Sequence, residues 1–193
     1  MKKTFQQVLF GFVFSLLICS LGIIHTPVAV QAKTTNATTS EKKKIKKLCN
    51  EFTNFLGMQL TEGDPSLAIS VGKSTTWIFE TWKKEDLTYR YNLVVPLQYM
   101  SDEGAAERVF GLKDFYVSPV IGDWGEAFPE LSLKSATKKS TSKYTAVCDI
   151  KWVNSMDNTT KKIGTATFTL KKKKGTHYGF IVKSIKIKKV ANF

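Results

Sequence analysis

Lysine side chains form three clusters that could bind anions. In the first cluster, five of the six residues from 42 to 47 are lysines, near the start of a predicted helix. A helix dipole disfavours positive charge at this end, and only Glu41 opposes it. The cluster is therefore either a solvated helix face or a docking surface. With two clusters in predicted turns, the candidate anion-binding residues are Lys42, Lys43, Lys44, Lys46, Lys47, Lys138, Lys139, Lys143, Lys171, Lys172, Lys173 and Lys174.

The remaining polar side chains form no catalytic pattern. Past residue 32 the only histidine is His177, in a lysine-rich turn where a surface position is the common outcome. No pair of carboxylates, His/Cys metal cluster or nucleophile elbow stands at a useful spacing. We expect no catalytic residue, no metal site and no cofactor, and a binding role rather than an enzymatic one.

An aromatic loop over residues 115–130 is a further candidate contact site. Tyr116, Trp124 and Phe128 stand among glycines and prolines. Exposed aromatic residues on such a loop are typical of contact sites. The alternative, which we favour, is a plug that closes one end of the domain.

The first 32 residues have the order of an export signal. Met1–Lys3 is basic, residues 8–24 are an almost unbroken apolar run, and Val30–Ala32 offers small residues for cleavage near Ala32. The apolar run also approaches the length of a membrane span, so an uncut anchor is the alternative. Ile18, directly before Cys19, argues against a lipoprotein. We expect a secreted or cell-surface protein.

The positive charge belongs to the chain after this signal. The formal net charge is +13, and the first 32 residues contribute only Lys2 and Lys3 to it. Such a charge favours anionic cell-surface polymers, membrane headgroups or a surface protein as partners, although it also serves solubility. Export argues against intracellular nucleic acid. The oligomeric state, a homodimer included, stays open.

The next residues predict a flexible Thr-rich leader over 33–40 and one domain over 41–193. Ser40 is the expected N-cap of an amphipathic helix over 41–56, which Gly57 should end. Weaker patterns follow. Ser74 should cap a short helix that carries Trp77, Ile78 and Trp82, and residues 87–95 read as a strand before Pro96. Ser101 should cap a helix that Gly111 closes.

The last sixty residues predict an antiparallel meander of four strands. Residues 131–137 form the first strand, and in residues 144–152 the apolar side chains alternate with polar ones. Residues 166–170 repeat this alternation. In the final strand Phe180 and Val182 are out of phase with Ile185 and Ile187, which predicts a β-bulge near Lys183–Ser184.

These elements define an α+β fold in which the helix packs its apolar stripe on the inner face of a curved sheet. Cys49 lies on that stripe and Cys148 on that face, so the packing brings both thiols inside. They form either a disulfide, which export permits, or two buried free thiols. The turn lysines 138–143 and 171–174 should open at one end of the sheet.

The segments YTAVCDIKW, GTATFTL and GFIVKSIKI, with the helix over 41–56, resemble the nuclear transport factor two-like, or cystatin-like, superfamily. The resemblance covers that helix and the last third of the chain. It implies a cone with a pocket between helix and sheet. Some members of the superfamily are isomerases or dehydratases, whereas many only bind or dimerise.

Two functions follow from this reading. The first is an exported, non-enzymatic binding module held at a surface by its lysines. The alternative is a small-molecule pocket protein or an enzyme of the same fold, in which Tyr144 and the aromatic loop line the cavity. A filled apolar interior would favour the module, and an open interior with polar groups would favour the enzyme.

Overall fold

The computed structural model describes residues 34–61, 73–79, 87–100, 102–119 and 125–190, all within one compact unit, Lys33–Phe193. The predicted export signal and its predicted cleavage site lie outside these residues. Trp82, Ser101 and Trp124 also lie outside them. None of the helices in the described ranges has the length and apolar character needed to cross a membrane.

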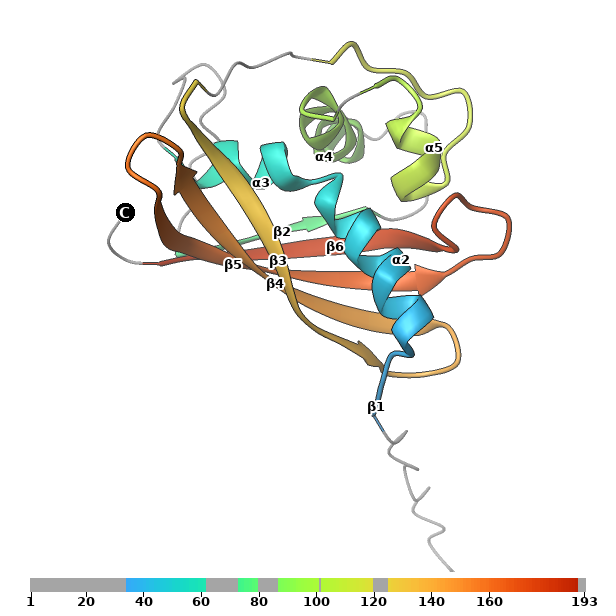
Figure 1. The fold of residues 1–193 in the computed structure, drawn as a ribbon. Coiled ribbons are helices and arrows are strands. Elements are labelled where there is room, and N and C mark those ends of the chain that lie inside the picture. The colour runs from blue at the N-terminus through green and yellow to red at the C-terminus, as the bar shows by residue number, and fades with distance from the viewer. Residues whose placement is uncertain (1–33, 62–72, 80–86, 101, 120–124, 191–193) are drawn as a thin grey trace, which may run out of the picture. The chain divides into compact units, whose positions relative to one another are not determined.

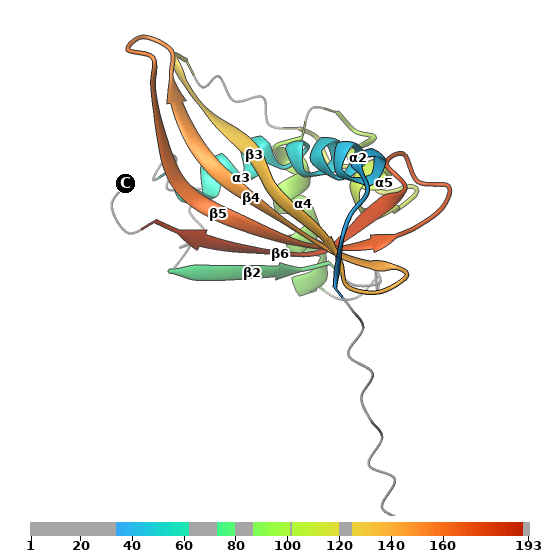
Figure 2. The same cartoon turned by 60° about the horizontal axis from the view of Figure 1, so that its bottom comes forward.

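The fold is α+β and is built on one curved, unclosed antiparallel sheet of six strands (Figures 1 and 2). In sheet order the strands are β1 (Thr35–Asn36), β3 (Ala127–Lys138), β4 (Lys143–Asn154), β5 (Thr159–Lys172), β6 (Phe180–Lys189) and β2 (Ser74–Ile78). The helices are α2 (Thr39–Asn50), α3 (Thr53–Leu60), α4 (Leu87–Gln98) and α5 (Ala105–Phe110). Figure 2 shows the helices on the concave side of the sheet.

The predicted C-terminal meander is confirmed, because β3 to β6 pair in chain order. On β4 and β5 the predicted inner residues from Tyr144 to Ile150 and from Ala166 to Leu170 are buried and their neighbours are more exposed. Trp152, also predicted to face inward, is only half-buried, because the register of β4 and β5 shifts after Ile150. The bulge is also where the phase change placed it. Thr169 pairs with Ser184 and Leu170 with Val182, which leaves Lys183 as the extra residue. The bulge thereby keeps Phe180 and Ile185 buried on the same face.

The structure contradicts the prediction that the Thr-rich leader is flexible. Thr35 and Asn36 form β1 and pair with Lys138 and Thr137 of β3. The N–H of Ala37 then donates to the carbonyl oxygen of Ala136. A short edge strand thus fixes the entry to α2, because its backbone groups find ladder partners.

The helix expected over 41–56 is two helices. Thr38, not Ser40, caps α2, and it forms a capping box with Glu41. The chain bends after Asn50, and α3 continues past Gly57, so this glycine ends no helix. It is buried, and a Cβ there would lie 2.5 Å from Cβ and Cγ of Pro129. A glycine is needed here because only a residue without a side chain lets α3 pack this closely on β3.

In the middle third of the chain, one predicted helix is a strand and one predicted strand is a helix. The expected helix from Ser74 is strand β2, which pairs with β6 and buries Trp77 while Ile78 stays exposed. The expected strand at 87–95 is helix α4, which includes Pro96. Short apolar runs do not separate helix from strand, and tertiary packing decides. The helix that Gly111 closes is confirmed, with Gly111 at φ 69°, but its N-cap is Gly104 rather than the predicted Ser101.

Candidate functional site

The bend between α2 and α3 lies beside an open surface cleft of about 370 Å³. Its lining comes from the end of α2, the start of α3, the end of the α4 segment and the β5–β6 turn. The residues that line it are Lys47, Asn50, Glu51, Thr53, Asn54, Tyr99 and Tyr178. This volume lies at the lower end of the usual range for small-molecule sites, about 300–1,000 Å³.

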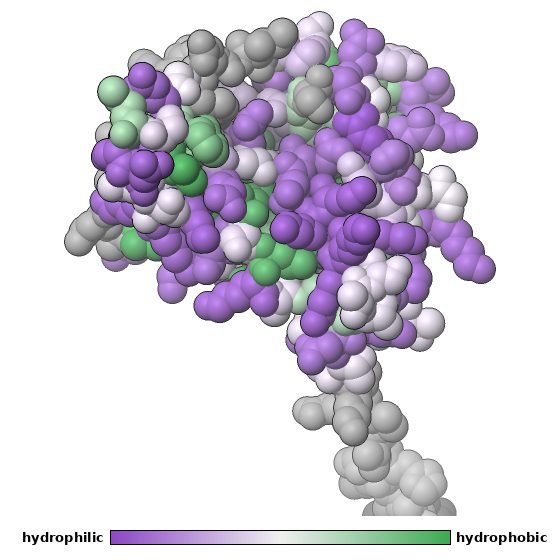
Figure 3. Space-filling model, viewed as in Figure 1, coloured by the Kyte–Doolittle hydropathy of each residue, from purple (hydrophilic) through white to green (hydrophobic). Residues whose placement is uncertain are grey.

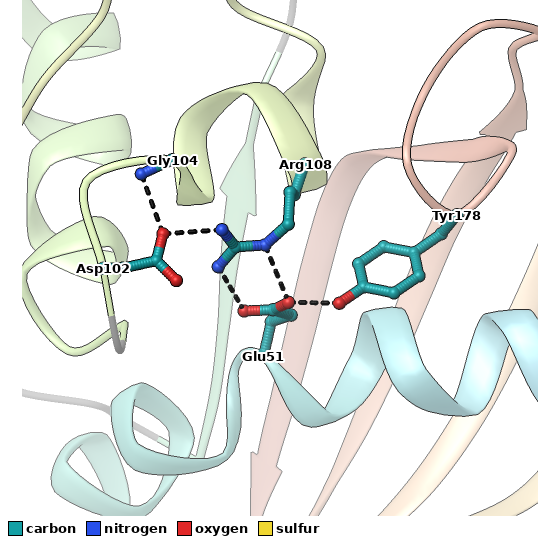
Figure 4. A network of polar contacts seen from close by, with 5 residues as sticks. All are labelled: Glu51, Asp102, Gly104, Arg108 and Tyr178. Atoms are coloured by element: carbon teal, nitrogen blue, oxygen red, sulfur yellow. Dashed lines mark hydrogen bonds and ion pairs between the residues drawn. The ribbon is translucent and has the colours of Figure 1, made fainter.

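Glu51 stands at the bend and is held by two other elements (Figure 4). Arg108 of α5 binds it with two N–H groups, Nε to Oε1 and Nη2 to Oε2, each at 3.1 Å. The Tyr178 hydroxyl donates to the same Oε1 from the β5–β6 turn. The side chains of Glu51 and Arg108 are only 12% and 20% exposed, so this bidentate pair is largely shielded from water.

Asp102 completes the network on its solvent side. Its Oδ1 accepts from Nη1 of Arg108 at 2.6 Å and from the backbone N–H of Gly104 at 2.8 Å. The hydrogen bond from Arg108 lowers the pKa of Asp102. The guanidinium is therefore fixed between two carboxylates, and its pKa is raised mainly by Glu51.

Burial and the acceptor Glu51 raise the pKa of Tyr178 to about 12. The phenol therefore stays protonated at neutral pH and keeps donating to Glu51. A group that moves protons near neutral pH needs a pKa near 7, so Tyr178 is suited to hold a carboxylate rather than to act as an acid or base. In the part of the chain that the structure describes, no group of three His, Cys, Asp or Glu side chains could hold a metal ion.

The predicted lysine clusters lie on one end of the domain. All five lysines of α2 are exposed, and none forms an ion pair within the described residues. The two lysine turns meet at the sheet end where α2 begins: Lys143 pairs with Lys171, and the N–H of Lys172 donates to the carbonyl oxygen of Ser142. Figure 3 shows hydrophilic side chains over the outer face of α2.

Glu41 fastens α2 to this end of the sheet. Its Oε1 accepts from the Tyr144 hydroxyl and from Lys172 Nζ, each at 2.8 Å. The Lys172 hydrogen bond is the main cause that lowers the pKa of Glu41 to about 2. Burial, followed by this contact with Glu41, raises the pKa of Tyr144. Glu41, the acid in the first turn of α2, is thus already committed to internal partners.

The other predicted site residues do not line the cleft. Tyr144 is fully buried. Tyr116 and Phe128 are 70% and 41% exposed, so neither plugs the domain, whereas their neighbours Phe115 and Pro129 pack inward. His177 is exposed on the lysine-rich turn and contacts the ring of Tyr178.

The two cysteines meet in the core as free thiols rather than as a disulfide. Cys49 of α2 and Cys148 of β4 are 0% and 1% exposed. Burial, with the neighbouring thiol of Cys148, raises the pKa of Cys49 well above its usual value. A buried thiol with a raised pKa is a poor nucleophile, so the pair acts as core packing.

The sequence reading missed the cleft and its network, which join residues far apart in the chain. One signal was present. The chain has only two arginines against many lysines, and Arg108 is one of them. An arginine in a lysine-rich chain indicates a site that needs a planar, bidentate donor.

A scan of protein-family models and searches of curated proteins and of solved structures found no match.

Proposed function

We propose that the protein is an exported, non-enzymatic binding module that docks on anionic surface polymers through the lysines around α2. The observation that carries this proposal is the joint placement of the three lysine clusters at one end of the sheet. The five lysines of α2 keep their charge unpaired within the described residues. Charges of one sign gathered on one surface raise the local concentration of a polymer of the other sign.

The interior supports binding over catalysis. Seven inner residues of β4 and β5 are at most 1% exposed: Tyr144, Ala146, Cys148, Ile150, Ala166, Phe168 and Leu170. They face the buried side chains of α2, such as Ile45 and Leu48. A pocket between helix and sheet, as in the enzymes of the resembled superfamily, would need open space and polar groups there. The small-molecule alternative therefore depends on the surface cleft instead.

The fold-level part of the proposal is that this domain is a cone of the nuclear transport factor two-like, or cystatin-like, superfamily. Its support is the bulged meander with helices on the concave side. The open sheet and the separate α3 are the features in which the domain departs from the expected cone with one long first helix.

The test is retention on immobilised polyphosphate over a salt series. We expect retention at low salt and release by about 1 M salt, where the screening length falls to about 3 Å. Replacing Lys43, Lys44 and Lys46 by Gln should lower the salt concentration of elution. The matched control removes the same charge at Lys73, Lys186 and Lys188, which are exposed away from α2.

The control lysines are well placed for this comparison, because Ile185 and Ile187 are buried on the helix side of β6 and the alternating lysines project from the opposite face. An equal loss in both triple variants would mean that only net charge matters, and it would contradict docking through α2. Retention indifferent to salt would contradict lysine-driven binding altogether. An uncharged dextran resin measures adsorption to the support.

A further inference from the structure

The cleft at the α2–α3 bend presents hydrogen-bonding groups that no other described residue uses. Asn50 and Asn54 are exposed and line the cleft with Lys47. Their side-chain amides make no hydrogen bond within the described residues. Each amide offers two donors and an acceptor in one plane. The rim of the cleft can therefore bind a ligand whose groups both donate and accept.

The floor of the cleft is rigid. Glu51 is held by Arg108 and Tyr178, and Arg108 is held in turn by Asp102. Tyr178 is half-buried and lines the cleft, so its ring offers an apolar surface at a fixed place. A rigid site loses little conformational entropy when a ligand binds. The floor thus combines a carboxylate acceptor with an aromatic ring.

The cleft side chains that already have hydrogen-bond partners restrict the class of ligand that the cleft can bind. Three of the five N–H groups of Arg108 already donate to carboxylates and its side chain is only 20% exposed, so little of the guanidinium is offered to a phosphate. Lys47 is an exposed cation on the rim, and its N–H groups can donate to a hydroxyl group. Glu51 would repel a second carboxylate, and the polar rim does not suit an apolar ligand. Neutral sugars fit what remains, because their hydroxyl groups donate and accept while their C–H faces pack on aromatic rings.

We propose that this cleft binds a neutral hexose unit of a glycan. Asn50 and Asn54 would hydrogen-bond its hydroxyl groups, Glu51 would accept from another, and the Tyr178 ring would support its apolar face. This site goes beyond the proposed function, because it recognises an uncharged group on a different set of side chains. Its binding should survive high salt, at which lysine-driven docking is lost.

The experiment titrates the full-length protein, in mild detergent, with soluble oligomers of N-acetylglucosamine, glucose and galactose at about 1 M salt, where charge attraction is screened. Binding is followed by calorimetry and by chemical shift changes. We expect saturable binding of at least one oligomer. The double variant N50A/N54A should weaken it about tenfold, the loss of one or two hydrogen bonds. Asn36→Ala, at an exposed asparagine of β1, is the matched control.

Two further variants separate the ring from the hydroxyl. Tyr178→Phe keeps the ring and should retain sugar binding within a few-fold, whereas Tyr178→Ala should abolish it. The near-ultraviolet circular dichroism spectrum checks that each variant is folded. Absence of saturable binding by all three oligomers, or unchanged binding by a folded N50A/N54A protein, would overturn the proposal. The triple variant at Lys43, Lys44 and Lys46 should bind sugar normally even if it loses polyphosphate, so the two proposals fail independently.

Discussion

Glu41 is the residue at which the start of α2, strand β4 and the end of β5 are tied together. It completes the capping box with Thr38 and accepts from Tyr144 and Lys172. One carboxylate therefore accepts from the N–H of the N-cap residue Thr38 and from a buried phenol at once. Replacing Glu41 should therefore lower the free energy of unfolding of the whole domain, although Glu41 lies near the surface.

The pH dependence of stability should report Glu41. Its pKa is lowered from 4.5 to about 2, so its ionised form stabilises the folded state fully above about pH 4.5. This contribution is lost as the pH falls through the folded pKa. Glu41→Gln should lower the free energy of unfolding at neutral pH by about 1–2 kcal/mol and should flatten its fall in acid. Urea unfolding at neutral pH and at about pH 3 measures both effects. Glu103→Gln, at an exposed acid, is the control.

Arg108 gives a second prediction at the residue scale. Arg108→Ala leaves Glu51, which is 12% exposed, without its bidentate partner. We expect the free energy of unfolding to fall by about 2–4 kcal/mol, near the range for a broken buried pair. Arg108→Lys should recover only part of this loss, because lysine lacks the planar pair of donors. Denaturant unfolding measures each variant, with exposed Lys113→Ala as the control. Full recovery by lysine would mean that charge alone holds Glu51.

At the scale of elements, sequence patterns predicted the strands that have one face in the core. Strands β4 and β5 alternate regularly, and the phase change in β6 located its bulge, because a period of two admits one register. Sequence patterns failed where the same residues fit both a helix and a strand. Residues 87–95 alternate as a strand would, yet Leu93, Val95 and Leu97 are all buried in helix α4. Contacts distant in the chain, which no local pattern contains, decided between the two.

One part of the candidate site could be predicted from the sequence and another could not. The lysine surface was predictable, because runs such as residues 42–47 are local and the meander fixes which turns share an end. The cleft was not, because Glu51, Arg108 and Tyr178 come from three elements whose approach depends on the bend after α2. That bend was hidden by an apolar periodicity that continues from Ile45 through Leu56 without a break in hydrophobicity.

Gly57 tests the packing of α3 on β3. A Cβ at this position would lie 2.5 Å from Cβ and Cγ of Pro129. Gly57→Ala should therefore destabilise the protein by about 1–3 kcal/mol, even though alanine is the better helix former. In the double variant with Pro129→Gly the clash is gone, so the two changes should cost less together than their sum. Strict additivity in denaturant unfolding would show that the two residues do not collide.

At the scale of the whole molecule, charge and core are separated. The concave face of the sheet is filled by apolar side chains, and the basic residues lie on the outside of α2, on turns and on the opposite face of strands such as β6. A net charge of +13 favours anionic partners but repels itself in the compact state. The lysines of α2 should therefore carry a cost in stability, which the proposed binding role would account for.

The last prediction separates binding from stability. Lys42 and Lys43 lie four residues before Lys46 and Lys47 on α2, and like charges at this spacing on a helix repel each other. Lys42→Gln and Lys43→Gln should each raise the free energy of unfolding by about 0.3 kcal/mol while retention on polyphosphate falls. The control pair, Lys186→Gln and Lys188→Gln, should leave retention nearly unchanged. If retention falls only when stability also falls, the lysines act through the fold. If stability rises as retention falls, the charge on α2 is there to bind.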